Sequence, residues 1–260
     1  MPLYILDELR DNAPPSIPSL IGKGLLPAHG GRMWIVGSTG TGKSVVAFDI
    51  AFSLVLQEPL FRAYRTVGEK KIPIFPVHRP CKVLYLDAEL GPWGCHERAQ
   101  KFYQSRSFVN LERNFMILSG DFSVLSLNKE PGLSNMKTLI SHNRPEDSEQ
   151  PYVVIIDPIR DYHSLSENED EMSRLWNTLR AWQYEMKFAL IMVHHESDKP
   201  ILDAWGQSIQ RKGTARSRGH SVNPQSMDTM LGIRREINKP VTSLELTWEK
   251  VRHGPVPAEG

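Results

Sequence analysis

The sequence has few of the features that would place it in a specialised class of protein. It contains only two cysteines, Cys81 and Cys95, which form neither a disulfide framework nor a paired metal-binding motif, so we expect reduced thiols. The longest apolar run, residues 45–56, contains Asp49 and is too short to cross a bilayer. The N-terminus has no basic start followed by an apolar stretch, so we expect no signal peptide. A cytoplasmic protein without a membrane partner is the simplest interpretation.

The net charge is also too small to indicate a type of partner. The net charge is +1 over 260 residues, so no overall field points to nucleic acid or membrane, and any basic surface must be local. Apolar residues make up 40% and charged residues 23% of the chain, as in ordinary globular proteins.

We expect residues 1–18 to form an amphipathic segment with a proline-rich linker, and residues 19–260 to form one domain.

Short apolar runs alternate with helical patterns, which is typical of an α/β fold with a mostly parallel central sheet flanked by helices. The expected strands cover residues 33–36, 82–87, 115–118, 152–157 and 188–193, and the expected helices cover 43–56, 95–104 and 170–185. The alternating tail turns near residues 238–240 and predicts a C-terminal antiparallel hairpin at the sheet edge. Residues 59–80, 141–150 and 201–223 are expected to be loops.

The stretch "GSTGTGKS" fits the phosphate-loop pattern G-x-x-x-x-G-K-[ST] and stands between an expected strand and an expected helix. Glycines let backbone N–H groups surround phosphates, and the helix N-terminus adds positive potential. In this pattern Lys43 would reach the β- and γ-phosphates and Ser44 would ligate Mg²⁺. The predicted nucleotide-binding residues are Gly37, Ser38, Thr39, Gly40, Thr41, Gly42, Lys43, Ser44 and Val45.

Two carboxylates follow other expected strands. Asp157 ends the apolar run "YVVIID", where it could help to hold Mg²⁺ or could instead cap the turn before Pro158. Glu89 follows "KVLYLD" and could accept a proton from the attacking water, because the carboxyl ends of parallel strands face the ligand crevice. Asp87 competes for this role, although we expect its side chain to face the backbone or the core.

His194 and His195 end a further apolar strand. A zinc site would need a third ligand at metal-site spacing, and the sequence offers none. One histidine could therefore sense the γ-phosphate from the carboxyl end of its strand. A purely structural histidine is the alternative.

The segments "LYLDAEL", "VVIIDPIRDYHSLSENEDEM", "LIMVHHESD", "ARSRGHS" and "WEKVRHGP" together resemble the RecA-like ATPases, specifically the hexameric replicative helicases of the RepA and DnaB types. The resemblance implies a RecA-like P-loop NTPase core that uses ATP and Mg²⁺. It makes Glu89 the catalytic base and His195 the sensor. It also matches Arg218 to a finger arginine, and Lys250 and Arg252 to groups that reach a neighbour's γ-phosphate. Arg98 would stack on adenine, unless it is a surface arginine.

The resemblance also implies that two loops line a central DNA channel. The first, residues 164–171, is acidic and a poor phosphate binder. The second carries Arg211, Lys212, Arg216 and Arg218, a basic patch suited to a single-stranded backbone. A merely solvated loop is the alternative.

The expected function is that of an ATP-hydrolysing ring that moves on single-stranded DNA. The resemblance implies that the ring is a hexamer and that the next subunit completes each ATP site. Two alternatives share this core. One is a phage- or plasmid-type recombinase or annealing ATPase that forms filaments, and the other is a KaiC-like regulatory ATPase.

Overall fold

A computed structural model describes residues 17–106, 113–120, 124–165, 169–195, 201–202, 208–209, 226–236 and 243–255. Residues 1–16 of the expected amphipathic segment and most of the expected loop 201–223 lie outside these ranges. The division into a segment 1–18 and a domain 19–260 therefore stays a prediction. No helix in the described part of the chain is long and apolar enough to span a membrane.

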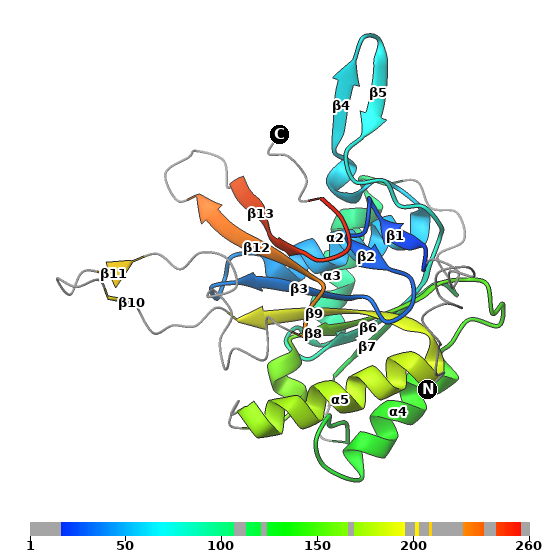
Figure 1. Ribbon diagram of the computed structural model, residues 1–260, viewed down its shortest axis with the longest axis vertical. Coiled ribbons are helices and arrows are strands. Elements are labelled where there is room, and N and C mark those ends of the chain that lie inside the picture. The colour runs from blue at the N-terminus through cyan, green and yellow to red at the C-terminus, as the bar shows by residue number, and fades with distance from the viewer. Residues whose placement is uncertain are drawn as a thin grey trace, which may run out of the picture.

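A seven-stranded sheet forms the centre of the molecule, in the order β13-β12-β3-β9-β8-β6-β7 (Figure 1). All its neighbouring strands are parallel except β12 and β13, which form an antiparallel hairpin at the edge. The expected α/β fold with a C-terminal hairpin is confirmed. Its strands are β3 (Arg32–Gly37), β6 (Lys82–Asp87), β7 (Phe115–Ser119), β8 (Tyr152–Asp157), β9 (Phe188–His195), β12 (Thr229–Glu236) and β13 (Ser243–Val251).

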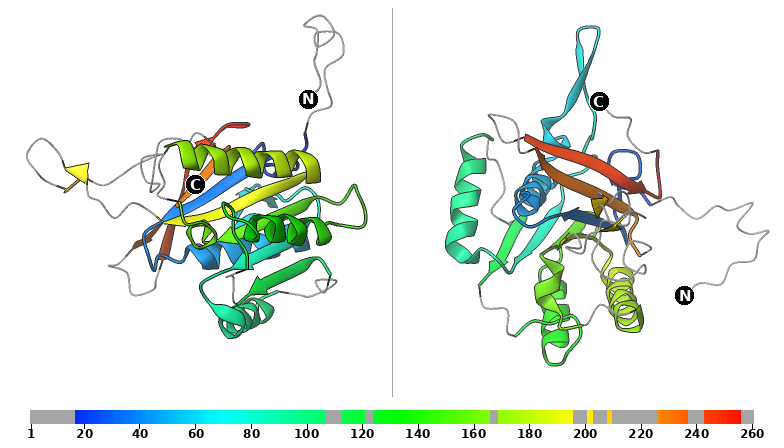
Figure 2. Two further views of the ribbon diagram at one scale, coloured as in Figure 1. Left: turned by 90° about the horizontal axis from the view of Figure 1, so that it is seen from below. Right: turned by 90° about the vertical axis from the view of Figure 1, so that its left-hand side faces the viewer.

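Two helices cover each face of this sheet (Figure 2). Helices α2 (Lys43–Leu56) and α3 (Gly91–Tyr103) lie on one face, and α4 (Gly132–His142) and α5 (Glu169–Met186) lie on the other. Helix α2 has the expected bounds, whereas α3 begins earlier than residue 95. The early start is possible because Pro92 falls in the first turn, where its missing N–H has no helical partner. Helix α4 was not predicted.

Strand β3 shows why the central strands read as continuous apolar runs. Met33 and Ile35 pack in the core beneath α2, while Trp34 and Val36 pack in the core beneath α5. All four side chains are fully buried. A parallel strand covered on both faces needs apolar residues at every position, so the period-2 alternation disappears.

The prediction of a loop over residues 59–80 was wrong. The chain there forms the short helix η1 (Leu60–Arg62) and the antiparallel strands β4 (Tyr64–Val67) and β5 (Lys70–Pro73), which stand away from the body (Figure 1). Two more small pairs were not predicted. They are β1 (Ser19–Ile21) with β2 (Leu26–Pro27), and β10 (Ile201–Leu202) with β11 (Ser208–Ile209).

Candidate nucleotide site

The glycine-rich loop joins β3 to α2 and has the backbone that a phosphate cradle requires. Gly40 and Gly42 have φ of 77° and 92°, in the left-handed region that glycine adopts without strain. A Cβ at Gly37 would lie 2.7 Å from the Ile233 carbonyl oxygen. The Lys43 ammonium donates to the Ser38 carbonyl at 2.8 Å, so it lies across the loop that it would share with phosphates.

Ser44, at the N-terminus of α2, lies next to Asp157, at the end of β8. The Ser44 hydroxyl donates to Asp157 Oδ1 at 3.1 Å, and the buried Tyr85 hydroxyl donates to Oδ2. Both Asp157 oxygens thus face Ser44 and Tyr85, not the turn at Pro158. Burial raises the pKa of Asp157 to about 6, against the opposing effect of these hydrogen bonds. A hydroxyl and a carboxylate are ligands that Mg²⁺ accepts, so this pair fits the predicted metal site.

The two acidic side chains at the end of β6, Asp87 and Glu89, have different surroundings. Asp87 is 1% exposed and accepts from the Ser119 hydroxyl at 2.7 Å and from the Leu90 N–H. Its carboxylate therefore faces the backbone and a strand neighbour, as expected from the sequence. Glu89 is half-exposed, and its Oε1 lies 3.6 Å from His195 Nε2. That contact is the main reason that the pKa of Glu89 lies below its usual value.

His194 and His195 project to opposite faces of β9, because successive strand residues alternate. The His194 ring is buried and stacks on Trp34, with ring centroids 4.6 Å apart. The other ring nitrogen of His195, Nδ1, lies 3.4 Å from the Thr39 hydroxyl. His195 thus links the phosphate loop to Glu89, while His194 belongs to the core.

Arg98 lies on α3 and turns toward α2. Its guanidinium carbon is 5.5 Å from the centroid of the Phe48 ring, a cation–π distance. Its positive charge also acts on Asp157 and Glu89, lowering the pKa of both. Arg98 therefore neighbours the candidate site, and its stacking on adenine stays a prediction.

The structure does not bring Lys250 and Arg252 to the phosphate loop. Strand β13 begins beside the loop, where Leu244 lies 3.4 Å from the position of a Cβ on Gly42. It runs antiparallel to β12 and ends opposite Thr229. At about 3.3 Å per residue, Arg252 lies about 26 Å along the strand from Leu244. The two predicted finger groups thus occupy the opposite end of the sheet.

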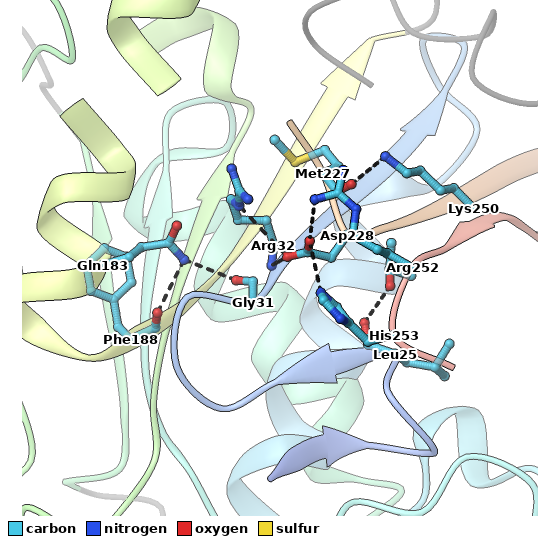
Figure 3. Close-up of polar contacts among 11 residues, drawn as sticks. Leu25, Gly31, Arg32, Gln183, Phe188, Met227, Asp228, Lys250, Arg252 and His253 are labelled. Carbon is cyan, nitrogen blue, oxygen red and sulfur yellow. Dashed lines mark hydrogen bonds and ion pairs between the residues drawn. The ribbon is translucent and has the colours of Figure 1, made fainter. Parts of the chain in front are cut away.

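Asp228, which was not predicted as a site residue from the sequence, organises that end (Figure 3). Its carboxylate accepts from Arg252 Nη1 at 3.1 Å and from the Arg32 backbone N–H at 3.0 Å, and it lies 3.2 Å from His253 Nε2. Lys250 donates to the Met227 carbonyl at 2.6 Å. The carboxylate of Asp228 thereby holds Arg252 beside the start of β3.

A β-bulge sets the direction of these side chains. Met230 pairs with Lys250, but Leu231 pairs with Trp248, which leaves Glu249 as an extra residue in β13. Trp248 and Val251 both pack on the core beneath α2. Because the bulge shifts the alternation by one residue, Lys250 and Arg252 point away from that core.

The remaining predicted residues, Arg211, Lys212, Arg216 and Arg218, lie outside the described part of the chain. Their roles in DNA binding and as a finger therefore stay predictions.

Comparison with known proteins gives a family and a fold. The model of the family described as the AAA domain matches residues 2–199, whereas no curated protein matches the chain. A similar solved structure is the ATPase domain of G40P, with a TM-score of 0.57 and 15% identity, over 96% of this chain and 90% of that one. This likeness confirms the RecA-like P-loop ATPase fold predicted from the sequence. Since the family match covers most of its length, the chain belongs to the AAA domain family of P-loop ATPases.

Proposed function

We propose that the protein is an ATP-hydrolysing motor that assembles into a ring, with six subunits as in the helicases it resembles, and moves on single-stranded DNA. One observation carries this proposal. The phosphate loop and the pair Lys250 and Arg252 lie at opposite ends of the sheet, about 26 Å apart along β13. A side chain cannot span that distance, so if these cations act on ATP, they act at the site of a neighbouring subunit.

Within one subunit, each side chain has a defined task. Lys43 would bind phosphate oxygens once it leaves the Ser38 carbonyl, and Ser44 and Asp157 would hold Mg²⁺. When bound, Mg²⁺ offsets negative charge on the phosphates. Glu89, whose pKa is lowered chiefly by its contact with His195, accepts a proton from the attacking water.

His195 connects these groups to the phosphate end. Its two ring nitrogens face Thr39 and Glu89, so a displacement of the phosphate loop changes the environment of the base. We infer that this histidine reports the γ-phosphate to Glu89. Arg98, whose charge already acts on both carboxylates, supports the ionised forms of the site.

The DNA part of the proposal depends on the basic segment with Arg211, Lys212 and Arg216, together with Arg218. Cations on a segment of this composition suit a phosphate backbone. The filament-forming recombinase and the KaiC-like regulatory ATPase share the nucleotide site. They differ in assembly and in their response to single-stranded DNA.

The test is ATP turnover by the purified full chain with and without single-stranded DNA, followed by unwinding of a forked duplex. We expect stimulation by DNA in the native protein. Glu89→Gln should bind nucleotide normally but lose turnover by about 10²-fold or more, because the proton acceptor is gone. An Arg211→Ala, Lys212→Ala variant should keep basal turnover and lose stimulation. Turnover that ignores DNA at every salt concentration would contradict the motor.

A further inference from the structure

The β4–β5 hairpin is a prominent part of the structure that the nucleotide site does not explain. Figure 1 shows it projecting from the body as a separate arm. Every residue of β4 is exposed, including Tyr64 and Val67 at 47% and 54%. Apolar and charged groups thus stand in solvent on a ribbon that contributes little to the core.

The base of this arm is fixed to the domain. The Ile74 N–H donates to the Ala63 carbonyl at 2.9 Å, and the Leu60 N–H donates to the Phe75 carbonyl at 3.0 Å. Phe75 lies between two aromatic rings, Phe61 at 6.2 Å and Trp248 at 5.5 Å between centroids. The arm is therefore held in a defined direction by packing on β13.

The cations of the arm occupy both faces of the ribbon. Residues opposite each other in an antiparallel pair share a face, and the register pairs Val67 with Lys70 and Thr66 with Lys71. Lys70 and Arg65 consequently lie on one face, and Lys71 lies on the other. Within the described part of the chain, these three cations have no ion-pair partner. Glu69 is the single acidic residue between 64 and 74.

We propose that the β4–β5 hairpin is a docking arm for double-stranded DNA. The arm enters a groove of the duplex and contacts the phosphates on both sides of it. A two-stranded ribbon has the width that the major groove of B-DNA admits. Cations on both faces match two rows of phosphates, whereas a flat protein partner would meet one face alone. Lysines and arginine without acidic partners bind phosphate without first breaking an ion pair.

The first test measures the affinity of the full chain for a short duplex by fluorescence anisotropy at several salt concentrations. The test variant is Arg65→Gln, Lys70→Gln, Lys71→Gln. Each lost phosphate contact should lower the slope of log affinity against log salt by about 0.9, or about 2.7 in all. At low salt we expect the Kd to rise by about tenfold or more.

The matched control removes three exposed cations from elsewhere, as Lys101→Gln, Arg144→Gln, Arg174→Gln. It has the same net charge as the test variant and should keep the native slope. Equal Kd and slope for the test variant and the native protein would overturn the proposal. So would an unchanged duplex affinity with a smaller assembly in sedimentation, since the arm would then dock on a second copy of the chain.

A second variant replaces residues 64–73 by two glycines, which the Ala63–Ile74 hydrogen bond at the base accommodates. It should keep the native melting temperature and basal ATP turnover while losing the same duplex affinity. Stimulation by single-stranded DNA is a separate readout. If that stimulation is absent in the native protein, the proposal of a DNA motor is wrong. If duplex affinity survives the deletion, the proposal that the arm binds duplex DNA is wrong.

Discussion

A mixture of two inactive variants tests whether the two ends of the sheet belong to one ATP site. Lys43→Ala removes the phosphate-binding lysine and keeps Arg252, while Arg252→Ala does the reverse. Since a trans arginine is worth about 10³-fold or more in comparable systems, each variant alone should have almost no turnover. In a mixed ring, an interface works when an intact phosphate loop faces an intact Arg252.

The expected magnitude follows from random assembly. In an equal mixture, about a quarter of the interfaces bring an intact loop against an intact arginine, so turnover should return to about a quarter of the native value. Phosphate release measured across mixing ratios should rise and fall symmetrically, with its maximum at equal amounts. Circular dichroism and the melting temperature check that both variants are folded.

The control is the double variant Lys43→Ala, Arg252→Ala, which should rescue neither single variant. Two results would contradict the inference, drawn from the 26 Å separation along β13, that Arg252 acts at a neighbouring subunit's ATP site. One is substantial turnover by Arg252→Ala alone. The other is a mixture that forms mixed rings and stays inactive at every ratio.

Two further predictions concern the carboxylate of Asp157 and the end of β13. Burial raises the pKa of Asp157 to about 6, so Mg²⁺-dependent nucleotide binding should weaken as pH falls through that value and the carboxyl gains a proton. Tyr85→Phe removes a hydrogen bond to the ionised form and should move this midpoint upward by about one pH unit. A nucleotide fluorescence titration at several pH values checks both, with Tyr152→Phe as control and an unmoved midpoint as the contrary result. A Cβ at residue 254 would lie 1.6 Å from the Lys23 carbonyl oxygen. Gly254→Ala should therefore lower the free energy of unfolding by about 1–3 kcal/mol in denaturant titrations, and an unchanged value would show that this approach is not tight.

The sequence predicted those elements whose signal is local. Strand β8 is apolar from Tyr152 to Ile156 because both faces are covered, and helix α2 follows directly from the glycine-rich loop. The pair Ser44 and Asp157 could be proposed from the same logic, since each stands at the end of a well-marked element. Their 3.1 Å contact follows once β3 and β8 lie in one parallel sheet.

Elements with a weaker signal were missed. Val67-Gly68-Glu69-Lys70 contains a two-residue hairpin turn with glycine at its first central position, a recognised hairpin pattern. The flanking residues do not alternate clearly, because neither face of this ribbon is buried. Hydrophobic periodicity therefore gave no indication of strands β4 and β5.

Asp228 was missed for a different reason. It lies 196 positions from Arg32, whose backbone N–H it accepts, and no local pattern marks such a contact. Only the sheet order, with β12 next to β3, brings them together. The partners of an isolated carboxylate depend on tertiary structure, so they cannot be inferred from spacing.

The extra residue in β13 has a consequence for how such sequences should be aligned. Deleting Glu249 would remove the residue that the bulge accommodates, and plain alternation from Trp248 would still point Lys250 and Arg252 away from the core and Val251 into it. Without the bulge, the present sequence would instead alternate so that Lys250 and Arg252 point into the apolar layer. A one-residue gap beside Trp248 therefore belongs in an alignment of this ending, because the bulge and the deletion give the same side-chain directions.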